Sequence, residues 1–448
     1  MTSGAVGDAR ASGEDLRAEI ARLDRRVAEL EADRRRSSGA LTLDEFLEPV
    51  RLARRSLDLR RASGEKQDKV IKVVRPAAVT LPESSSFRRN PPRKPEDRQP
   101  EYLEQFDDRT VFYDVFQYGD DVWLNGPPLS NLKAPLGNGA WRVDGADVTG
   151  DLDLRDWGRT QRSVITGAGG GREVSFSLGN DRFTAEIQPN ESDLFAGQRT
   201  IITKSKDNDL VWIQDFLRYY HLVHGVTGIV FYDNNSTSYT PQDVADAIAE
   251  VDGITTAVVV DWPFPFGPQG GPNKVWDSDY CQYGLLEHGR FRYLSQAAGV
   301  ISADIDELML ADDGRSVFDH AAEAETGVVM FSGYWMAKAT RTPMPADRQR
   351  RFTDYHHRAK GTTTVKWAAL PAVVDELTTQ WRVHSVAGSG AVKTDKIHHR
   401  HFEGVNSGWR YNRSEGVAQT DAHVYDARMS RVLDLVFGSD PEGVPGAW

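Results

Sequence analysis

Strands and helices alternate from about residue 200 onward, and this alternation constrains the fold more than any other feature of the chain. Short β-branched runs typical of buried strands cover residues 200–203, 228–232 and 257–260. Helical patterns at 210–224 and 241–250 separate these runs. Strands that alternate with helices form a mostly parallel sheet covered by helices. The sequence therefore predicts an α/β domain, which we place at residues 196–437.

The N-terminal residues 1–36 predict a helix with a coiled-coil-like stripe. Its apolar positions are Leu16, Ile20, Leu23, Val27 and Leu30, at the 4-3-4-3 spacing of a and d positions. Only about two heptads are present, which is marginal for an independent coiled coil. Two interpretations therefore stand: an oligomerisation helix that forms a homo-oligomer, or an amphipathic helix that docks on its own chain.

Four further segments differ in composition. Residues 41–75 form a basic helical segment, and residues 76–100 form a Pro-rich linker or extended arm. Short aromatic and β-branched runs at 111–113, 122–124, 163–165, 174–176 and 183–185, separated by turn residues, predict a small antiparallel β-rich domain at 101–195. Residues 438–448 are expected to be a tail.

Composition limits the classes of function and location. No window approaches the roughly 18 to 20 apolar residues of a membrane-spanning helix, and the N-terminus lacks the apolar core of a secretory signal. We therefore expect a cytoplasmic protein. The net charge of −12 argues against nucleic-acid binding, whereas fourteen basic against nine acidic side chains at 41–100 would suit peripheral association with the inner face of a membrane.

Polar residues follow the first two predicted strands of the α/β domain. Lys204 and Asn208 follow the first strand, and Asp233 and Asn234 follow the second. Ligands of open α/β sheets bind at the carboxyl ends of strands, so these residues are candidates for nucleotide binding. The alternative is an ordinary turn and helix cap, for which the same residue types are typical.

Asp304 and Asp306 are the candidate metal ligands. They follow the apolar run 300–303, and in an extended segment their side chains would point to the same side. Two carboxylates held together repel each other unless a cation or water lies between them. Mn²⁺ or Mg²⁺ there could bind the diphosphate of a nucleotide sugar. An isolated Asp-x-Asp without function is the alternative.

A histidine cluster lies far downstream. If residues 397–402 are extended, His399 and His401 share one face, and His398 and Arg400 share the other. Neutral imidazoles can complete the coordination shell of a metal, so His399 and His401 are candidate ligands. A surface histidine run without function is the alternative. His384 is interpreted as a structural histidine.

Together these motifs resemble glycosyltransferase family 92, formerly domain of unknown function 23, and its bacterial relatives, over residues 200–415. The matching segments are TKSKDN (203–208), WIQDF (212–216), HGV (224–226), FYDNNST (231–237), DIDEL (304–308), WRVH (381–384) and HRHF (399–402). The chain departs from the family at Asn208-Asp209, where many members have Asn-Glu.

The resemblance implies a GT-A fold and transfer of a sugar from a UDP-hexose, UDP-galactose in many eukaryotic members, with inversion. Asp233 would contact the nucleoside and Asp304 the ribose or the metal. Asp306 would bind the metal, and His399 or His401 the metal or the diphosphate.

The expected function is hexosyl transfer to a glycan or lipid-linked glycan in surface or capsular polysaccharide synthesis. Inversion needs a general base, and the candidates are Asp354, Glu376 and Glu403. One alternative is a nucleotidyl- or sugar-phosphate transferase, which would also use paired aspartates. Another is a noncatalytic glycan-binding or assembly protein.

Overall fold

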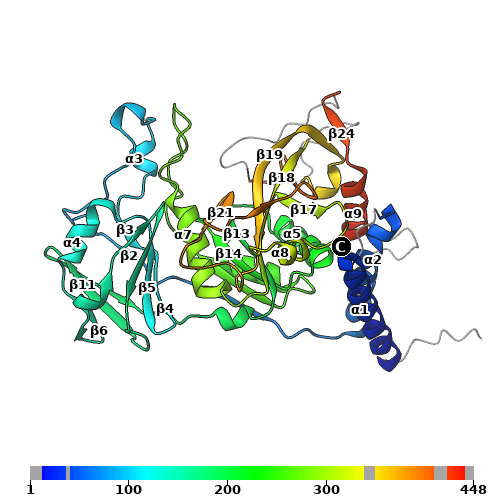
Figure 1. The fold of residues 1–448 in the computed structure, drawn as a ribbon, viewed down its shortest axis with the longest axis horizontal. Coiled ribbons are helices and arrows are strands. Elements are labelled where there is room, and N and C mark those ends of the chain that lie inside the picture. The colour runs from blue at the N-terminus through cyan, green and yellow to red at the C-terminus, as the bar shows by residue number, and fades with distance from the viewer. Residues whose placement is uncertain (1–12, 37–40, 338–348, 408–420, 439–448) are drawn as a thin grey trace, which may run out of the picture.

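The computed structural model describes residues 13–36, 41–337, 349–407 and 421–438 (Figure 1). In these residues the chain forms an α/β fold around an eleven-stranded mixed sheet. In spatial order its main strands are β1 (Val70–Val74), β15 (Thr256–Asp261), β14 (Gly228–Asp233), β13 (Arg199–Ser205), β16 (Gly299–Ser302), β19 (His357–Ala369), β18 (Val328–Met336), β23 (Ile397–Phe402) and β17 (Glu307–Ala311). The short β22 (Val392–Lys393) pairs with β18, and β24 (His423–Tyr425) pairs with β19.

Helices cover both faces of this sheet. Ile201 of β13 packs with α5 (Leu210–His224), α6 (Pro241–Ala249), α8 (Val317–Glu323) and α9 (Ala427–Phe437) in one apolar core. The next residue, Ile202, packs with α7 (Tyr280–Gly289) in a second core on the opposite face, because successive side chains of a strand alternate. The predicted strands and helices of the region 200–260 are thus confirmed.

The strand directions change halfway across the sheet. β1, β15, β14, β13 and β16 are parallel, whereas β19 is antiparallel to both β16 and β18. β23 is parallel to β18 and antiparallel to β17. In the last pair Glu307 lies opposite His401, and Met309 lies opposite His399. This register brings residues that are about a hundred positions apart in the sequence onto neighbouring strands.

Two smaller antiparallel sheets precede the α/β region, and the first of them lies beside α7 (Figure 1). One contains β4 (Asp114–Tyr118), β5 (Asp121–Gly126), β10 (Thr160–Ile165), β8 (Leu152–Asp153) and β9 (Asp156–Trp157). The other contains β12 (Asp181–Glu186), β11 (Glu173–Leu178), β6 (Trp141–Val143) and β7 (Ala146–Asp147). β2 (Val79–Thr80) pairs with β3 (Thr110–Phe112), and α3 (Tyr102–Gln105) and α4 (Lys133–Gly137) are single short turns. The predicted antiparallel strands of this region are confirmed.

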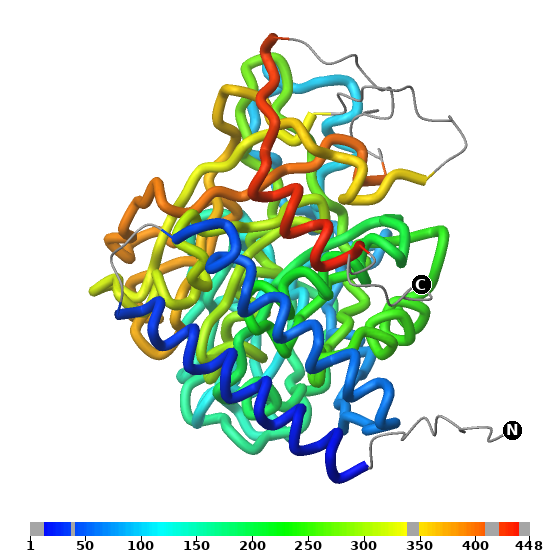
Figure 2. The backbone as a smooth tube through the Cα atoms, turned by 90° about the vertical axis from the view of Figure 1, so that its right-hand side faces the viewer, coloured from blue at the N-terminus to red at the C-terminus, as the bar shows by residue number. Residues whose placement is uncertain are grey.

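The N-terminal helices α1 (Gly13–Arg36) and α2 (Leu43–Ser63) lie side by side (Figure 2). Ile20 and Leu23 of the a/d stripe are buried in this arrangement. The Asp24 carboxylate accepts a hydrogen bond from the Ser56 hydroxyl at 2.6 Å. Phe46 and Leu47 of α2 belong to the main core. The middle of the α1 stripe is therefore covered within the chain, whereas Leu16, Val27 and Leu30 are half-buried.

The segment 76–100 packs as an extended arm. Arg89, which is 1% exposed, donates hydrogen bonds to the carbonyls of Pro128, Asp107 and Thr110. The helical segment predicted at 41–75 ends earlier, since α2 stops at Ser63 and residues 70–74 form the edge strand β1 of the central sheet, outside the predicted α/β domain 196–437. Among the described residues, no helix has the length and apolar content needed to cross a membrane. Of the predicted tail 438–448, residues 439–448 lie outside the described residues.

Candidate functional site

The candidate site lies where the order of the parallel strands reverses. From β13 the chain passes through α5 to β14 on one side, whereas β16, which follows α7, lies on the other side of β13. Ligands of open α/β sheets bind in the crevice at such a reversal. A pocket opens there, lined by Thr203, Lys204, Gln282, Ser302, Asp304 and Lys366, together with apolar side chains.

Two lysines hold the Asp304 carboxylate at the edge of this pocket. Lys204 Nζ lies 2.9 Å from Asp304 Oδ1, and Lys366 Nζ lies 2.7 Å from Asp304 Oδ2. Burial alone would raise the pKa of Asp304, but the two ammonium groups hold it well below its usual range. Lys366, which is 2% exposed, also lies 2.7 Å from Glu307 Oε2. Asp304 is therefore an ionised carboxylate with two cationic partners.

The segment that carries the two aspartates differs from the extended strand predicted for it. β16 ends at Ser302, and the backbone N–H of Glu307 donates to the Asp304 carbonyl at 3.0 Å, which closes a turn. The side chains of Asp304 and Asp306 consequently have separate partners. Asp306 Oδ2 lies 3.1 Å from His401 Nε2, whereas Asp304 is held by lysines. Because the turn interrupts the strand, the alternation of side chains in an unbroken strand does not apply to Asp304 and Asp306.

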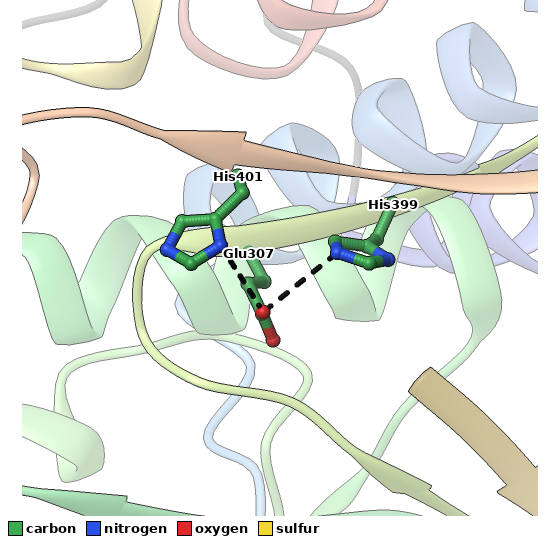
Figure 3. A group of neighbouring side chains, drawn as sticks. All are labelled: Glu307, His399 and His401. Carbon is green, nitrogen blue, oxygen red and sulfur yellow. Dashed lines mark ion pairs between the residues drawn. The ribbon is translucent and has the colours of Figure 1, made fainter. Parts of the chain in front are cut away.

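Glu307, His399 and His401 form a group that could hold a metal ion (Figure 3). Glu307 Oε1 lies 3.5 Å from His401 Nδ1 and 3.8 Å from His399 Nε2. Glu307 and His399 are at most 1% exposed. None of these three atoms has a hydrogen-bond partner, nor does His399 Nδ1. Buried polar atoms without a partner are costly, and a cation is one way to satisfy them.

The His401 ring lies between two carboxylates. Its Nε2 faces Asp306, and its Nδ1 faces Glu307. The Asn406 amide lies 3.5 Å from the same Asp306 carboxylate. Against the effect of burial, Asp306 and Glu307 raise the pKa of His401. Burial and the neighbouring Lys366 lower the pKa of His399 well below its usual range. His399 is thus a neutral imidazole, the form in which histidine binds metals.

The face assignment in β23 is confirmed. His399 and His401 point toward Glu307, whereas Arg400 pairs with Asp426 at 2.9 Å and the His398 ring contacts the Tyr334 ring. The alternation of side chains along a strand places them so.

The candidate nucleoside-binding residues lie at the ends of β13 and β14. Burial raises the pKa of Asp233 to about 6, although its carboxylate accepts a hydrogen bond from the Ser236 hydroxyl. The Asn234 amide donates to the carbonyls of Trp262 and Phe264, at 2.9 Å each. The Asn208 amide donates to Ser205 Oγ at 2.9 Å, and its oxygen accepts from the Ser407 backbone. Asn208 and Asn234 thus brace the loops that follow β13 and β14.

The three carboxylates considered as general bases have different surroundings. Asp354 accepts a hydrogen bond from the Arg351 backbone at 2.8 Å and caps a short helical turn. Glu376 accepts from the Tyr118 hydroxyl, near the small β sheets. Glu403 follows the end of β23, where its backbone N–H donates to the Met336 carbonyl at 3.2 Å. Asp354 and Glu376 are therefore engaged in local structure.

No family model and no curated protein sequence matches this chain. Support for a function therefore comes from the geometry of the site and from the sequence motifs.

Proposed function

We propose that the protein is a metal-dependent glycosyltransferase of the GT-A type. It transfers a hexose from a nucleotide sugar, a UDP-hexose, to a hydroxyl of a glycan or lipid-linked glycan, with inversion at the anomeric carbon. The resemblance of residues 200–415 to family 92 supplies the donor class. Physical support comes from a pocket at the strand reversal and from a nearby group of side-chain atoms that could hold a metal ion.

The observation that carries the proposal is the buried group of Glu307, His399 and His401. Its unpartnered oxygen and nitrogen atoms converge on one position, as the ligands of a divalent cation do. Two imidazoles suit Mn²⁺ better than Mg²⁺, which prefers oxygen ligands and keeps its waters. We therefore narrow the expected cation to Mn²⁺ or a similar transition metal. Asp306 orients the His401 ring through its Nε2.

The charges around the pocket suit a diphosphate. The cluster contains three carboxylates and two ammonium groups: Asp304 pairs with Lys204 and Lys366, Glu307 pairs with Lys366, and Asp306 pairs with His401. A divalent cation makes the cluster net positive, and it stabilises the negative charge of the departing nucleoside diphosphate. Lys204, whose side chain is 20% exposed, can move from Asp304 to a phosphate. Lys366 keeps the two carboxylates in place.

The test is release of nucleoside diphosphate from a panel of nucleotide sugars, as a function of Mn²⁺ concentration. Glu307→Gln keeps the shape of the side chain but removes its charge. In this variant we expect the Mn²⁺ concentration for half-maximal release to rise by about tenfold or more. His398→Gln is the matched control, because its ring lies on the opposite face of the same strand. It should keep the Mn²⁺ dependence of the wild type.

Three outcomes would contradict the proposal in different ways. Unchanged Mn²⁺ dependence in Glu307→Gln would refute the metal assignment. Release of pyrophosphate or nucleoside monophosphate would indicate a nucleotidyl- or sugar-phosphate transferase. Absence of binding to every nucleotide tested would favour a noncatalytic glycan-binding protein.

A further inference from the structure

A two-residue hairpin turn places His384 next to a residue that lines the pocket. Strands β20 (Gln380–Arg382) and β21 (Ser385–Ala387) pair with Arg382 opposite Ser385, so Val383 and His384 form the tip. Val383 lines the pocket together with Asp304 and Lys366. The neighbouring His384 is exposed to solvent. His384 is thus the solvent-exposed neighbour of a pocket residue, within electrostatic range of Lys366, Asp304 and Glu307.

The hairpin is held by anchors in the surrounding layers. The Trp367 indole N–H of β19 donates to the Arg382 carbonyl at 2.7 Å. The backbone N–H of Trp381 donates to Glu287 Oε1 of α7 at 3.0 Å. Both tryptophans are fully buried. Catalytic groups need such support, because a displacement of about 1 Å can cost about a hundredfold in rate.

One hydrogen bond fixes the tautomer of the His384 ring. Its Nδ1 lies 2.9 Å from the Val365 carbonyl oxygen. A carbonyl oxygen only accepts hydrogen bonds, so Nδ1 must carry the proton. In the neutral ring Nε2 is then the acceptor. A histidine oriented in this way by its other nitrogen is the usual arrangement of a general base.

The surroundings favour the neutral form of this ring. Part of the ring faces solvent, but the chain around it still removes water, and this partial burial lowers the pKa of His384. The positive charge of Lys366 lowers the pKa further, whereas Asp304 and Glu307 oppose the shift. At neutral pH the ring is therefore available to accept a proton.

We propose that His384 is the general base of the transfer reaction. This inference rests on the proposed glycosyltransferase function. The acceptor hydroxyl gives its proton to Nε2 of His384 while its oxygen bonds to the anomeric carbon. The bond from that carbon to the diphosphate oxygen breaks, and its electron pair leaves with the nucleoside diphosphate. The imidazolium then releases the proton to solvent.

The structure favours His384 as the base over Asp354, Glu376, Asp304 and Asp306, whose carboxylates are already engaged. Asp354 accepts a hydrogen bond within a helical turn, and Glu376 accepts one from the Tyr118 hydroxyl. Asp304 is held by two lysines and Asp306 by His401. His384 combines a place next to Val383, which lines the pocket, with a fixed tautomer and an exposed ring.

The experiment uses the full chain with Mn²⁺ and UDP-hexoses, and octyl glucoside serves as a surrogate alcohol acceptor. UDP release is measured in wild type and in His384→Ala, with and without added imidazole, and the affinity for UDP is measured by calorimetry. We expect kcat to fall by about 10²- to 10⁴-fold in His384→Ala, with unchanged UDP affinity. Added imidazole should restore part of the rate. His356→Ala is the control, because its ring contacts Ser430 of α9.

The outcomes distinguish failure of the His384 assignment from failure of the proposed glycosyltransferase function. If His384→Ala releases UDP within threefold of the wild-type rate, His384 is not the base, and the glycosyltransferase proposal stands. A loss that imidazole does not restore, or that comes with weaker UDP binding, assigns the histidine a structural role. If the wild type neither binds UDP nor releases it, the proposed function fails, and this inference fails with it.

Discussion

Lys366 is the buried cation that balances the carboxylates of the site. Replacement by methionine leaves Asp304 and Glu307 without this partner, and breaking a buried ion pair costs about 3 to 5 kcal/mol. We expect Lys366→Met to lose about that much free energy of unfolding in denaturant titrations without metal. Added Mn²⁺ should stabilise the variant more than the wild type, because the ammonium no longer competes for the carboxylates. Equal stability with and without the lysine would contradict this.

The control for that variant is on the same strand. Lys360 of β19 is exposed, so Lys360→Met should leave the free energy of unfolding within about 0.5 kcal/mol of the wild type. The Mn²⁺ effect should also be unchanged there.

Asp233 makes stability depend on pH. Its pKa is about 6 in the folded protein against a reference of 3.8, so between these values the folded chain holds a proton that the unfolded chain releases. The free energy of unfolding therefore falls as pH rises through this window, by about 3 kcal/mol at most. Asp233→Asn should raise the melting temperature at pH 7.5 and leave it unchanged near pH 3.5. An equal shift at both pH values would rule out this cause.

At the residue scale, the sequence predicted the shared face of the two candidate metal-ligating histidines, but not the residues that they meet. Alternation along an extended strand placed His399 and His401 on one face. The role of Glu307 depends on the turn before it and on the register of β17 with β23. Lys366 lies in a β strand whose pattern carries no sign of the carboxylates opposite. Such pairings arise from tertiary contacts, which a single sequence does not encode locally.

Helix α2 is a structural part of the α/β core. Phe46 is 3% exposed and packs in the main core, whereas Leu43, one turn earlier, is 40% exposed. Phe46→Ala should lower the free energy of unfolding by about 3 to 5 kcal/mol, measured by chemical denaturation. Leu43→Ala should cost less than about 1 kcal/mol. Similar effects of the two changes would mean that α2 is a loosely attached appendage.

At the element scale, periodicity predicted the strands and helices where the pattern was long. The strands of the region 200–260 and the short strands of 111–185 follow from alternation and turn residues. The sequence could not identify α2 as the partner of the α1 stripe. An a/d pattern is the same whether the second helix belongs to the same chain or to another. The break between β16 and β17 was missed, since one internal hydrogen bond decides it.

Glu287 connects three parts of the whole molecule. Its side chain, 1% exposed, pairs with Arg162 of β10 at 2.6 Å and accepts from the Trp381 backbone of the hairpin, while α7 packs on the central sheet. Glu287→Gln should therefore lower the free energy of unfolding by about 3 to 5 kcal/mol. The denaturation curve should keep a single transition. Early, separate unfolding of the small sheets in the wild type would show that they are independent.

The register of β17 with β23 also has a mechanical consequence. Glu307 lies on one strand, and His399 and His401 lie on its antiparallel neighbour. A cation bound by all three side chains would link the two strands, which are about a hundred residues apart in the sequence. Hydrogen exchange of the amides in β17 and β23 should then slow markedly on addition of Mn²⁺, with little change in β14. Metal loading would thereby report on the rigidity of the sheet edge as well as on chemistry.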